Sequence, residues 1–131
     1  MEYRVPSINS IQITGNLVND ADIKYTPSGR PVVNFRIAST RRYKPKDSND
    51  WKEETIFLDA VLFGEQAERI HEKLKKGFPV YIEGRLRQRE WEDKDGQKKS
   101  KIEIVARRVQ VLKRTPKEEE QILEGEEDLP F

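Results

Sequence analysis

Apolar residues in this chain of 131 amino acids recur mainly at every second position, the spacing of strands that turn one face toward a core. The alternation is found in residues 11–17, 33–37, 80–91 and 102–112, whereas residues 55–63 are apolar on both faces apart from Asp59, as in a central strand. Helical spacing is clear only in residues 65–76, and Gly77 follows where a helix would end. The pattern predicts an all-β fold in which one helix joins the third strand to the fourth.

Two positions predict strong curvature in these strands. Gly15 shares the apolar phase of the first strand, where a missing side chain permits a bend or a bulge. The apolar phase of the last strand shifts between Ile104 and Val109, which predicts a bulge or a bend there. Turn residues predict hairpin loops at 25–31 and 41–54. A curved five-stranded sheet with its helix between strands three and four is the arrangement of the OB-fold barrel.

The charge of the chain is divided unevenly along its length. Residues 1–115 hold 24 Lys and Arg against 17 Asp and Glu, whereas residues 116–131 hold one Lys against seven acids. A chain of this length suits one domain and a tail, so we expect a barrel domain at 1–115, a short flexible linker at 116–125 and an acidic tip at 126–131. A basic domain with a separate acidic end is typical of a polyanion-binding protein, although a solvated surface on a highly charged protein is the alternative.

Several classes of protein are disfavoured by composition. The chain has no cysteine and a single histidine, His71, which argues against disulfides, thiolate chemistry and Cys- or His-based metal sites. No apolar run approaches the roughly 20 residues that cross a bilayer, and the first ten residues lack the pattern of a signal peptide. We therefore expect a soluble cytoplasmic protein without a metal or cofactor.

Aromatic residues are interleaved with basic residues in two places. Tyr43 lies in a basic run and Trp91 follows a strand of alternating arginines. The basic residues concerned, which we expect to contact phosphate, are Arg41, Arg42, Lys44, Lys46, Arg85, Arg87 and Arg89. Stacking of a nucleic-acid base on an aromatic ring contributes about 1 to 3 kcal/mol and needs no sequence match. This interleaving predicts a sequence-independent binder of single strands.

Three further aromatics are candidates for stacking. Phe57 shares a face with Asp59, which favours a surface position. For Phe63 the pattern supports a core position and a surface position equally. Trp51 lies in the expected loop and is either a stacking residue or a loop anchor. Phe35, in an apolar alternating strand, is expected in the core.

The last residues of the chain combine acids with an apolar end. Residues 115–131 contain too few apolar residues to bury a core of their own, so we expect a disordered tail. Its end, Asp128, Leu129, Pro130 and Phe131, presents a terminal carboxylate beside an apolar ring, a combination that docks into a basic-rimmed apolar pocket on a partner. The alternative is a solubilising tail.

Four stretches of this sequence resemble the bacterial single-stranded-DNA-binding protein family, and together they cover nearly the whole chain. They are INSIQITGNLVNDADIKYTPSGRPVVNFRIAS, EETIFLDAVLFGEQAE, GFPVYIEGRLRQREWED and DLPF. The resemblance places Tyr43, Phe57, Phe63 and Trp91 at the positions of the family's stacking aromatics. It also implies an OB fold, a homotetramer with single strands wrapped around its outside, and a tail tip that binds replication, recombination and repair enzymes.

Three departures from the family's pattern concern assembly, charge and reach. Leu58 replaces a histidine that often lies at the subunit interface of the family, and we expect Leu58 and Tyr81 at such an interface here. Asp59 and Glu65 stand where basic residues are frequent, which predicts weaker local contact with phosphate. The linker at 116–125 is shorter than is usual in the family, which predicts a shorter reach of the tail.

These observations together predict a non-enzymatic protein that shelters single-stranded DNA during replication, recombination and repair, in the bacterial cytoplasm at the nucleoid. An OB-fold nuclease needs clustered carboxylates around a metal ion, whereas the acids of this chain are dispersed or lie in the tail. An RNA-binding or replication-restart scaffold remains the more serious alternative, and a preference for RNA over DNA would favour it.

Overall fold

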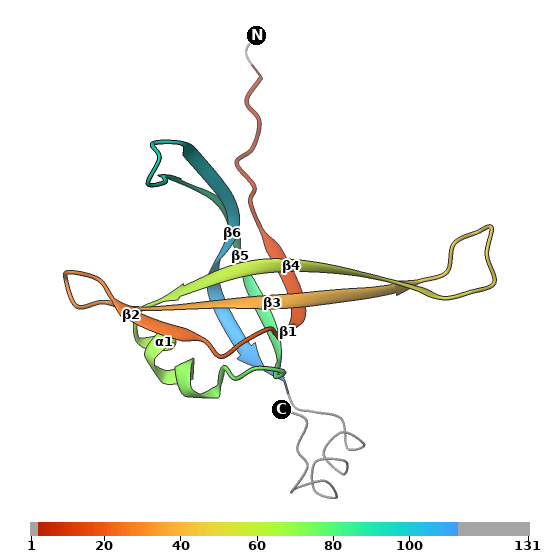
Figure 1. Cartoon of the computed structure of the whole chain (residues 1–131), viewed down its shortest axis with the longest axis horizontal. Coiled ribbons are helices and arrows are strands. Elements are labelled where there is room, and N and C mark those ends of the chain that lie inside the picture. Colours follow the sequence, from red (N-terminus) through yellow and green to blue (C-terminus); the bar gives the residue numbers. More distant parts are fainter. Residues whose placement is uncertain (1–2, 113–131) are drawn as a thin grey trace, which may run out of the picture.

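The computed structural model describes residues 3–112. Within this range the strands are β1 (Ile11–Leu17), β2 (Asp22–Tyr25), β3 (Pro31–Tyr43), β4 (Lys52–Phe63), β5 (Pro79–Glu92) and β6 (Lys98–Val111). The helix α1 (Glu65–Ile70) and the 3₁₀ turn η1 (His71–Lys73) join β4 to β5. Figure 1 shows two long hairpins, β3–β4 and β5–β6, that extend away from the barrel in different directions. No helix in residues 3–112 is long and apolar enough to cross a membrane.

Five of the strands close into a barrel. β1 pairs antiparallel with β5 from Ile11 to Asn16 and then with β3 at Asn16 and Leu17. The ring is completed by the antiparallel pairs β5–β6 and β3–β4 and by a short parallel pairing of β4 with β6. The predicted five-stranded OB barrel with a helix between its third and fourth long strands is confirmed. β2 is an additional short strand that pairs with the start of β3.

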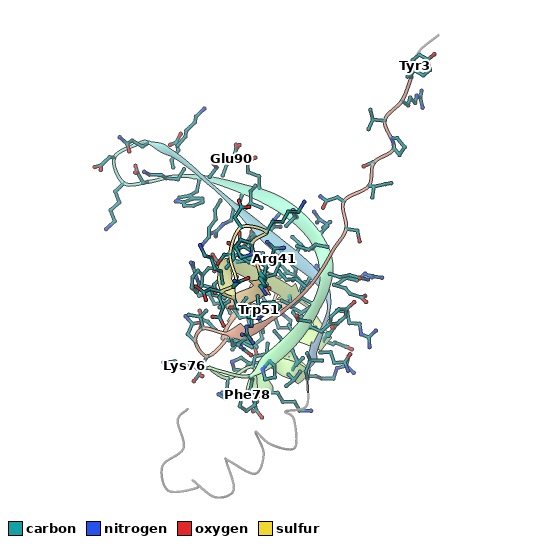
Figure 2. All side chains as sticks on the ribbon, turned by 90° about the vertical axis from the view of Figure 1, so that its right-hand side faces the viewer. Tyr3, Arg41, Trp51, Lys76, Phe78 and Glu90 are labelled. Atoms are coloured by element: carbon teal, nitrogen blue, oxygen red, sulfur yellow. The ribbon has the colours of Figure 1, made fainter. Side chains whose placement is uncertain are left out.

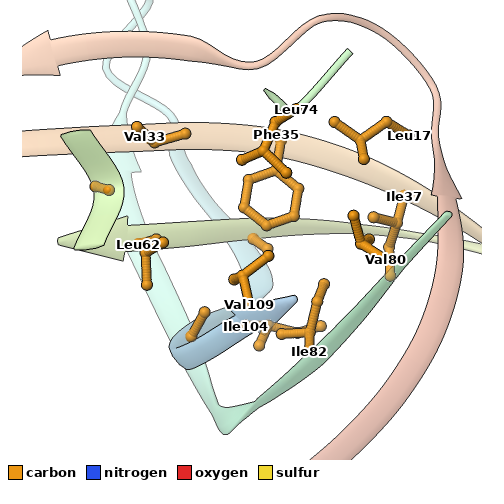
Figure 3. Close-up of a cluster of buried hydrophobic side chains, with 13 residues drawn as sticks. Leu17, Val33, Phe35, Ile37, Leu62, Leu74, Val80, Ile82, Ile104 and Val109 are labelled. Carbon is orange, nitrogen blue, oxygen red and sulfur yellow. The ribbon is translucent and has the colours of Figure 1, made fainter. Parts of the chain in front are cut away.

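The core lies inside this ring and is made by alternate residues of the strands (Figure 3). Phe35 is buried among aliphatic residues, as expected from the sequence. The fully buried side chains with the largest volumes are Ile37, Leu62, Leu74, Ile82, Ile104, Val33 and Val80. Ala67 of α1 and Leu74 after η1 are buried in the same cluster, so the helical segment covers one end of the barrel. Burial of such side chains contributes about 1.5 to 3 kcal/mol each.

The predicted shift of apolar phase in the last strand corresponds to a bulge. Glu83 of β5 lies opposite Arg108 of β6, whereas the next residue, Gly84, lies opposite Ala106. Arg107 therefore has no partner in the ladder, and the buried positions pass from Ala106 to Val109 in a step of three. A bulge increases the local twist, which suits a strand that must bend around a closed barrel.

Gly15 lies where β1 approaches β3 most closely. A Cβ added to Gly15 would lie 2.7 Å from the carbonyl oxygen of Ala38. The glycine thus allows one strand to pair on both sides within a few residues, because no side chain separates the two backbones.

Two predicted boundaries were wrong. The expected loop at 41–54 is shorter, because β3 continues to Tyr43 and β4 begins at Lys52. Opposite charges face each other across this exposed ladder, with Arg41 3.3 Å from Glu54 and Arg42 3.7 Å from Glu53. Such cross-strand pairs stabilise a ribbon whose polar composition indicates a loop.

The helix expected at 65–76 also ends early, at Ile70, and passes through η1. The following backbone bonds to the segment after β1 instead of continuing the helix. Ala21 N–H donates to the Leu74 carbonyl at 2.9 Å, and Lys76 N–H donates to Asp20 Oδ1 at 2.8 Å. These tertiary hydrogen bonds and the burial of Leu74 outweigh the helical pattern.

Candidate nucleic-acid interface

The outer wall of the barrel carries the aromatic residues singled out in the sequence. Phe57 and Phe63 project from β4 on the face opposite the core residues Ala60 and Leu62, and 52% of the surface of Phe57 is exposed. Trp91 lies near the end of β5 and is 41% exposed. Phe63 is half-buried and lies outside the core cluster, so the structure favours its surface role over the core role. Tyr43 and Trp51 lie at the tip of the β3–β4 hairpin.

Each of these five aromatics has an arginine over its ring. The distances from the guanidinium carbon to the ring centroid are 5.2 Å for Arg30 on Phe63, 5.4 Å for Arg36 on Phe57, 4.9 Å for Arg41 on Tyr43, 5.7 Å for Arg42 on Trp51 and 4.9 Å for Arg89 on Trp91. The five stacking candidates therefore share one local chemistry. A cation over an exposed ring contributes about 0.5 to 1 kcal/mol, which orients the ring without locking it.

Two of these arginines, Arg30 and Arg36, were missed in the sequence. Arg36 lies in the outward phase of β3 between Asn34 and Ala38, and this phase was the available signal. Arg30 ends the turn before β3, where nothing in the sequence indicates that its side chain reaches Phe63 on a different strand. The contact arises because Val32 of β3 is paired with Phe63 of β4.

Charged residues form a row across four strands of this face. The register places Arg36 of β3 opposite Asp59 of β4, Asp59 opposite Glu103 of β6, and Glu103 opposite Arg87 of β5. The pairs Arg36–Asp59 and Arg87–Glu103 lie at 3.8 Å and 2.7 Å. The row therefore has a cation at each edge and two acids at its centre.

Both central acids are shared by two cations. Asp59 also forms an ion pair with Lys101, and Glu103, which is only 6% exposed, lies 3.9 Å from Arg89 as well as close to Arg87. The sequence predicted that Asp59 weakens contact with phosphate. In the structure the charge of Asp59 is balanced by Arg36, which lies opposite it on β3, and by Lys101 of β6, although the residue opposite it on β6 is the acid Glu103.

The predicted phosphate-binding residues fall into two groups. Arg85, Arg87 and Arg89 lie on the outer face of β5 together with Trp91. β6 lies between β5 and β4, and Arg85 and Arg87 line one hollow with Phe63 of β4. The second group lies at the β3–β4 hairpin around Tyr43 and Trp51, where Arg41 covers Tyr43 and Arg42 covers Trp51; Figure 2 labels Arg41 and Trp51 on this hairpin, which is seen end-on. Its members are Arg41, Arg42, Lys44 and Lys46. Exposed ion pairs such as Arg41–Glu54 contribute at most about 1 kcal/mol, so these arginines can exchange a carboxylate for a phosphate at low cost.

The structure does not bring the two expected interface residues together. Leu58 packs against the barrel core and is half-buried, whereas Tyr81 lies on the opposite face of the wall, between the buried Val80 and Ile82. The Tyr81 hydroxyl donates a hydrogen bond of 2.6 Å to Glu83 Oε1, and this bond raises the pKa of Tyr81 above its ordinary value. The four tail residues Asp128, Leu129, Pro130 and Phe131 lie outside the described residues.

Comparison with known proteins connects this surface to one family. A model of the single-strand binding protein family matches residues 8–112, which include the barrel and all five aromatic–arginine pairs. The chain belongs to the single-strand binding protein family. Members of this family are non-enzymatic DNA-binding proteins, so the expectation that the chain is not an enzyme is confirmed.

Individual members of the single-strand binding protein family agree with this assignment. The chain is 43% identical to single-stranded DNA-binding protein 1 of Xylella fastidiosa over 81% of its own length and 78% of that relative. It is 42% identical to the single-stranded DNA-binding protein of Aquifex aeolicus over 94% of its length and 82% of the relative.

Solved structures of single-strand binding proteins share the barrel. A deletion mutant of the single-stranded DNA binding protein from Thermus aquaticus has a TM-score of 0.71 and 30% identity, and the match covers 81% of this chain and 51% of that one. The Plasmodium falciparum protein, solved in complex with single-stranded DNA, has a TM-score of 0.74 and 26% identity. That match covers 85% of this chain and all of the other.

Proposed function

We propose that this chain binds single-stranded DNA without regard to base sequence, and shelters it during replication, recombination and repair. The observation that supports the proposal best is the set of five arginine-covered aromatic rings on one barrel. A stacked base gains about 1 to 3 kcal/mol from each ring, whichever base it is. The guanidinium beside each ring lies where a neighbouring phosphate has to pass, so one aromatic–arginine pair serves both parts of a nucleotide.

The arrangement of the five pairs suits a flexible single strand rather than a duplex. Two pairs lie at the tip of the β3–β4 hairpin, and three lie on the outer faces of β4 and β5. A duplex keeps its bases paired inside, so their flat faces cannot reach separate rings on different elements. A single strand exposes its bases one after another and can follow the barrel wall.

The decisive experiment for this function is competition between nucleic acids. Labelled oligo(dT) bound to the full chain is challenged with unlabelled oligo(dT), with duplex DNA and with oligo(U) of equal length, and fluorescence anisotropy reports displacement. We expect oligo(dT) to displace the label at far lower concentration than the duplex. Stronger displacement by oligo(U) than by oligo(dT) would instead assign the chain to the RNA-binding modules.

The assembly and the tail extend the same proposal. We expect a homotetramer in the bacterial cytoplasm with DNA wrapped around its outside, with Leu58 and Tyr81 at subunit contacts, and a tail tip that recruits replication, recombination and repair enzymes. The support is the resemblance of the chain to the family's pattern, from which Leu58 departs by replacing a histidine with an apolar residue, together with the apolar end of an acidic tail.

Deletion of Leu129, Pro130 and Phe131 separates recruitment from DNA binding. Because the aromatic–arginine pairs lie within residues 3–112, we expect the truncated chain to keep its affinity for oligo(dT). We expect it to lose the partner enzymes that the full chain retains in a pull-down from bacterial lysate. Recovery of the same enzymes by both chains would contradict a role of the tail tip.

A further inference from the structure

A hollow lined by four arginines lies beside Phe63. Its volume is about 370 Å³, and its wall includes Arg30 from the turn before β3, Arg85 and Arg87 from β5, and Arg107 from β6. No carboxylate belongs to its lining, although acids lie next to most other arginines of this surface. The hollow is therefore a place where positive charge converges beside a ring that is suited to stack a base.

Arg107 reaches this hollow because of the bulge in β6. It is the residue that the ladder leaves without a partner, between Ala106 and Arg108. The side chain of Gln66 in α1 binds the backbone on both sides of the bulge: its Nε2 donates to the Arg107 carbonyl at 3.1 Å, and its Oε1 accepts from Val109 N–H at 3.2 Å. These two bonds pair a backbone carbonyl at the bulge and an N–H just after it, and they fix the point from which the arginine projects.

The four guanidinium groups carry more charge than their carboxylate partners balance. Arg87 pairs with Glu103 at 2.7 Å, and Arg107 pairs with Glu83 at 2.8 Å. Arg30 and Arg85 have no carboxylate partner within residues 3–112. The buried Nε–H of Arg87 also finds no acceptor in this part of the chain. Two unbalanced cations and an unused donor around one hollow are the features of an anion site.

We propose that this hollow binds a phosphodiester of the DNA strand next to the base stacked on Phe63, and that Arg107 is a DNA-binding residue held in place by Gln66. The proposal rests on the proposed function and adds a specific subsite to it. The guanidinium of Arg30, which covers Phe63 at 5.2 Å, moves from the ring to the phosphate when a base arrives. Arg85, Arg87 and Arg107 approach the same phosphate from β5 and β6.

The test compares Arg107→Ala with Arg108→Ala. Both residues are exposed arginines on β6, but Arg108 lies outside the hollow, and its side chain bonds to Gln110 at 3.2 Å. Because the Arg107 side chain is 77% exposed, its removal leaves the fold intact. We expect Arg107→Ala to weaken oligo(dT) binding about two- to fivefold at moderate salt, and Arg108→Ala to leave it unchanged.

Salt dependence identifies the lost contact as a phosphate. The log–log slope of affinity against salt should fall by about 0.7 for Arg107→Ala, the change expected for one phosphate contact on a single strand. The slope should be that of the unmodified chain for Arg108→Ala. If the unmodified chain binds oligo(dT) and both variants share its affinity and slope, the hollow is not a phosphate site. If the unmodified chain does not bind oligo(dT), the proposed function itself has failed.

Two further variants test the positioning role and the shared nucleotide. Gln66→Leu keeps the bulk of the side chain but removes both bonds to the bulge, and we expect a reduced salt slope in addition to lower thermal stability. A purely structural role of Gln66 would lower stability and leave the slope unchanged. In a double-mutant cycle, Phe63→Ala and Arg107→Ala should weaken binding by less than the product of their separate effects, because both hold one nucleotide. Independent effects would contradict a single subsite.

Discussion

Trp91→Ala is expected to weaken the binding of oligo(dT) by about 1 to 3 kcal/mol, which corresponds to roughly 5- to 150-fold in the dissociation constant. The indole ring is exposed near the end of β5, and Arg89 lies 4.9 Å from its centroid. A second hollow adjoins the ring and leaves the indole accessible to a base; it is lined by Glu90 and Glu92 of β5 and by Lys98, Lys99 and Ser100 of β6. Alanine removes the stacking surface and leaves the basic residues in place.

A matched control separates stacking from a general loss of aromatic surface. Tyr3 is 88% exposed on the segment before β1, and Figure 2 shows it far from Arg41 and Trp51. Tyr3→Ala should bind oligo(dT) like the unmodified chain, and both variants should melt at nearly the same temperature because neither ring belongs to the core. Equal dissociation constants for Trp91→Ala and the unmodified chain at identical salt would refute the stacking role of Trp91.

Gly84→Ala is expected to produce the largest loss of stability of any single methyl group added to this barrel. A Cβ at Gly84 would lie 2.2 Å from the carbonyl oxygen of Val105 and 3.0 Å from the Cα of Ala106. Both atoms belong to the backbone of β6, and Gly84 is also paired with Ile11 of β1. Neither β5 nor β6 can therefore move away from the added methyl group without breaking hydrogen bonds between strands. We expect a cost of about 3 kcal/mol or more in the free energy of unfolding.

Urea denaturation of Gly84→Ala and Gly29→Ala checks this expectation. Gly29 has a φ of +86° in the turn before β3, and an added Cβ there meets nothing within 4 Å. Alanine at Gly29 therefore costs only its unfavourable backbone conformation, about 1 kcal/mol. A loss at Gly84 no larger than that at Gly29 would show that the barrel absorbs the collision, and would contradict the tight approach of β5 and β6.

Local patterns in the sequence were sufficient to predict the barrel. The period of two located four of the long strands, an apolar run at 55–63 located β4, and the phase shift between Ile104 and Val109 located the bulge at Arg107. The patterns failed where long-range contacts decide the local structure. The exposed ladder beyond Thr40 depends on charges that meet only after β3 and β4 pair, and the end of α1 depends on the burial of Leu74.

In the candidate site, too, local patterns were predicted and long-range contacts were missed. Exposed aromatics among basic residues are visible in a linear sequence, so Tyr43, Phe57, Phe63, Trp91 and Trp51 were identified together with seven basic residues. Arg30 and Arg36 were missed because their partners Phe63 and Phe57 lie more than 20 positions away in the chain. Arg107 was missed because only the bulge in β6 and its bonds to Gln66 direct it toward the hollow beside Phe63.

The most direct measurement is a titration of the intrinsic tryptophan fluorescence with oligo(dT) and with duplex DNA at several salt concentrations. Trp51 and Trp91 both lie beside arginines on the proposed DNA surface, so their fluorescence reports stacking without a label. We expect strong quenching by oligo(dT), little by the duplex, and an affinity that falls with salt at a log–log slope of about −0.7 per phosphate contact. An absence of quenching together with an absence of affinity would mean that this surface does not bind single strands.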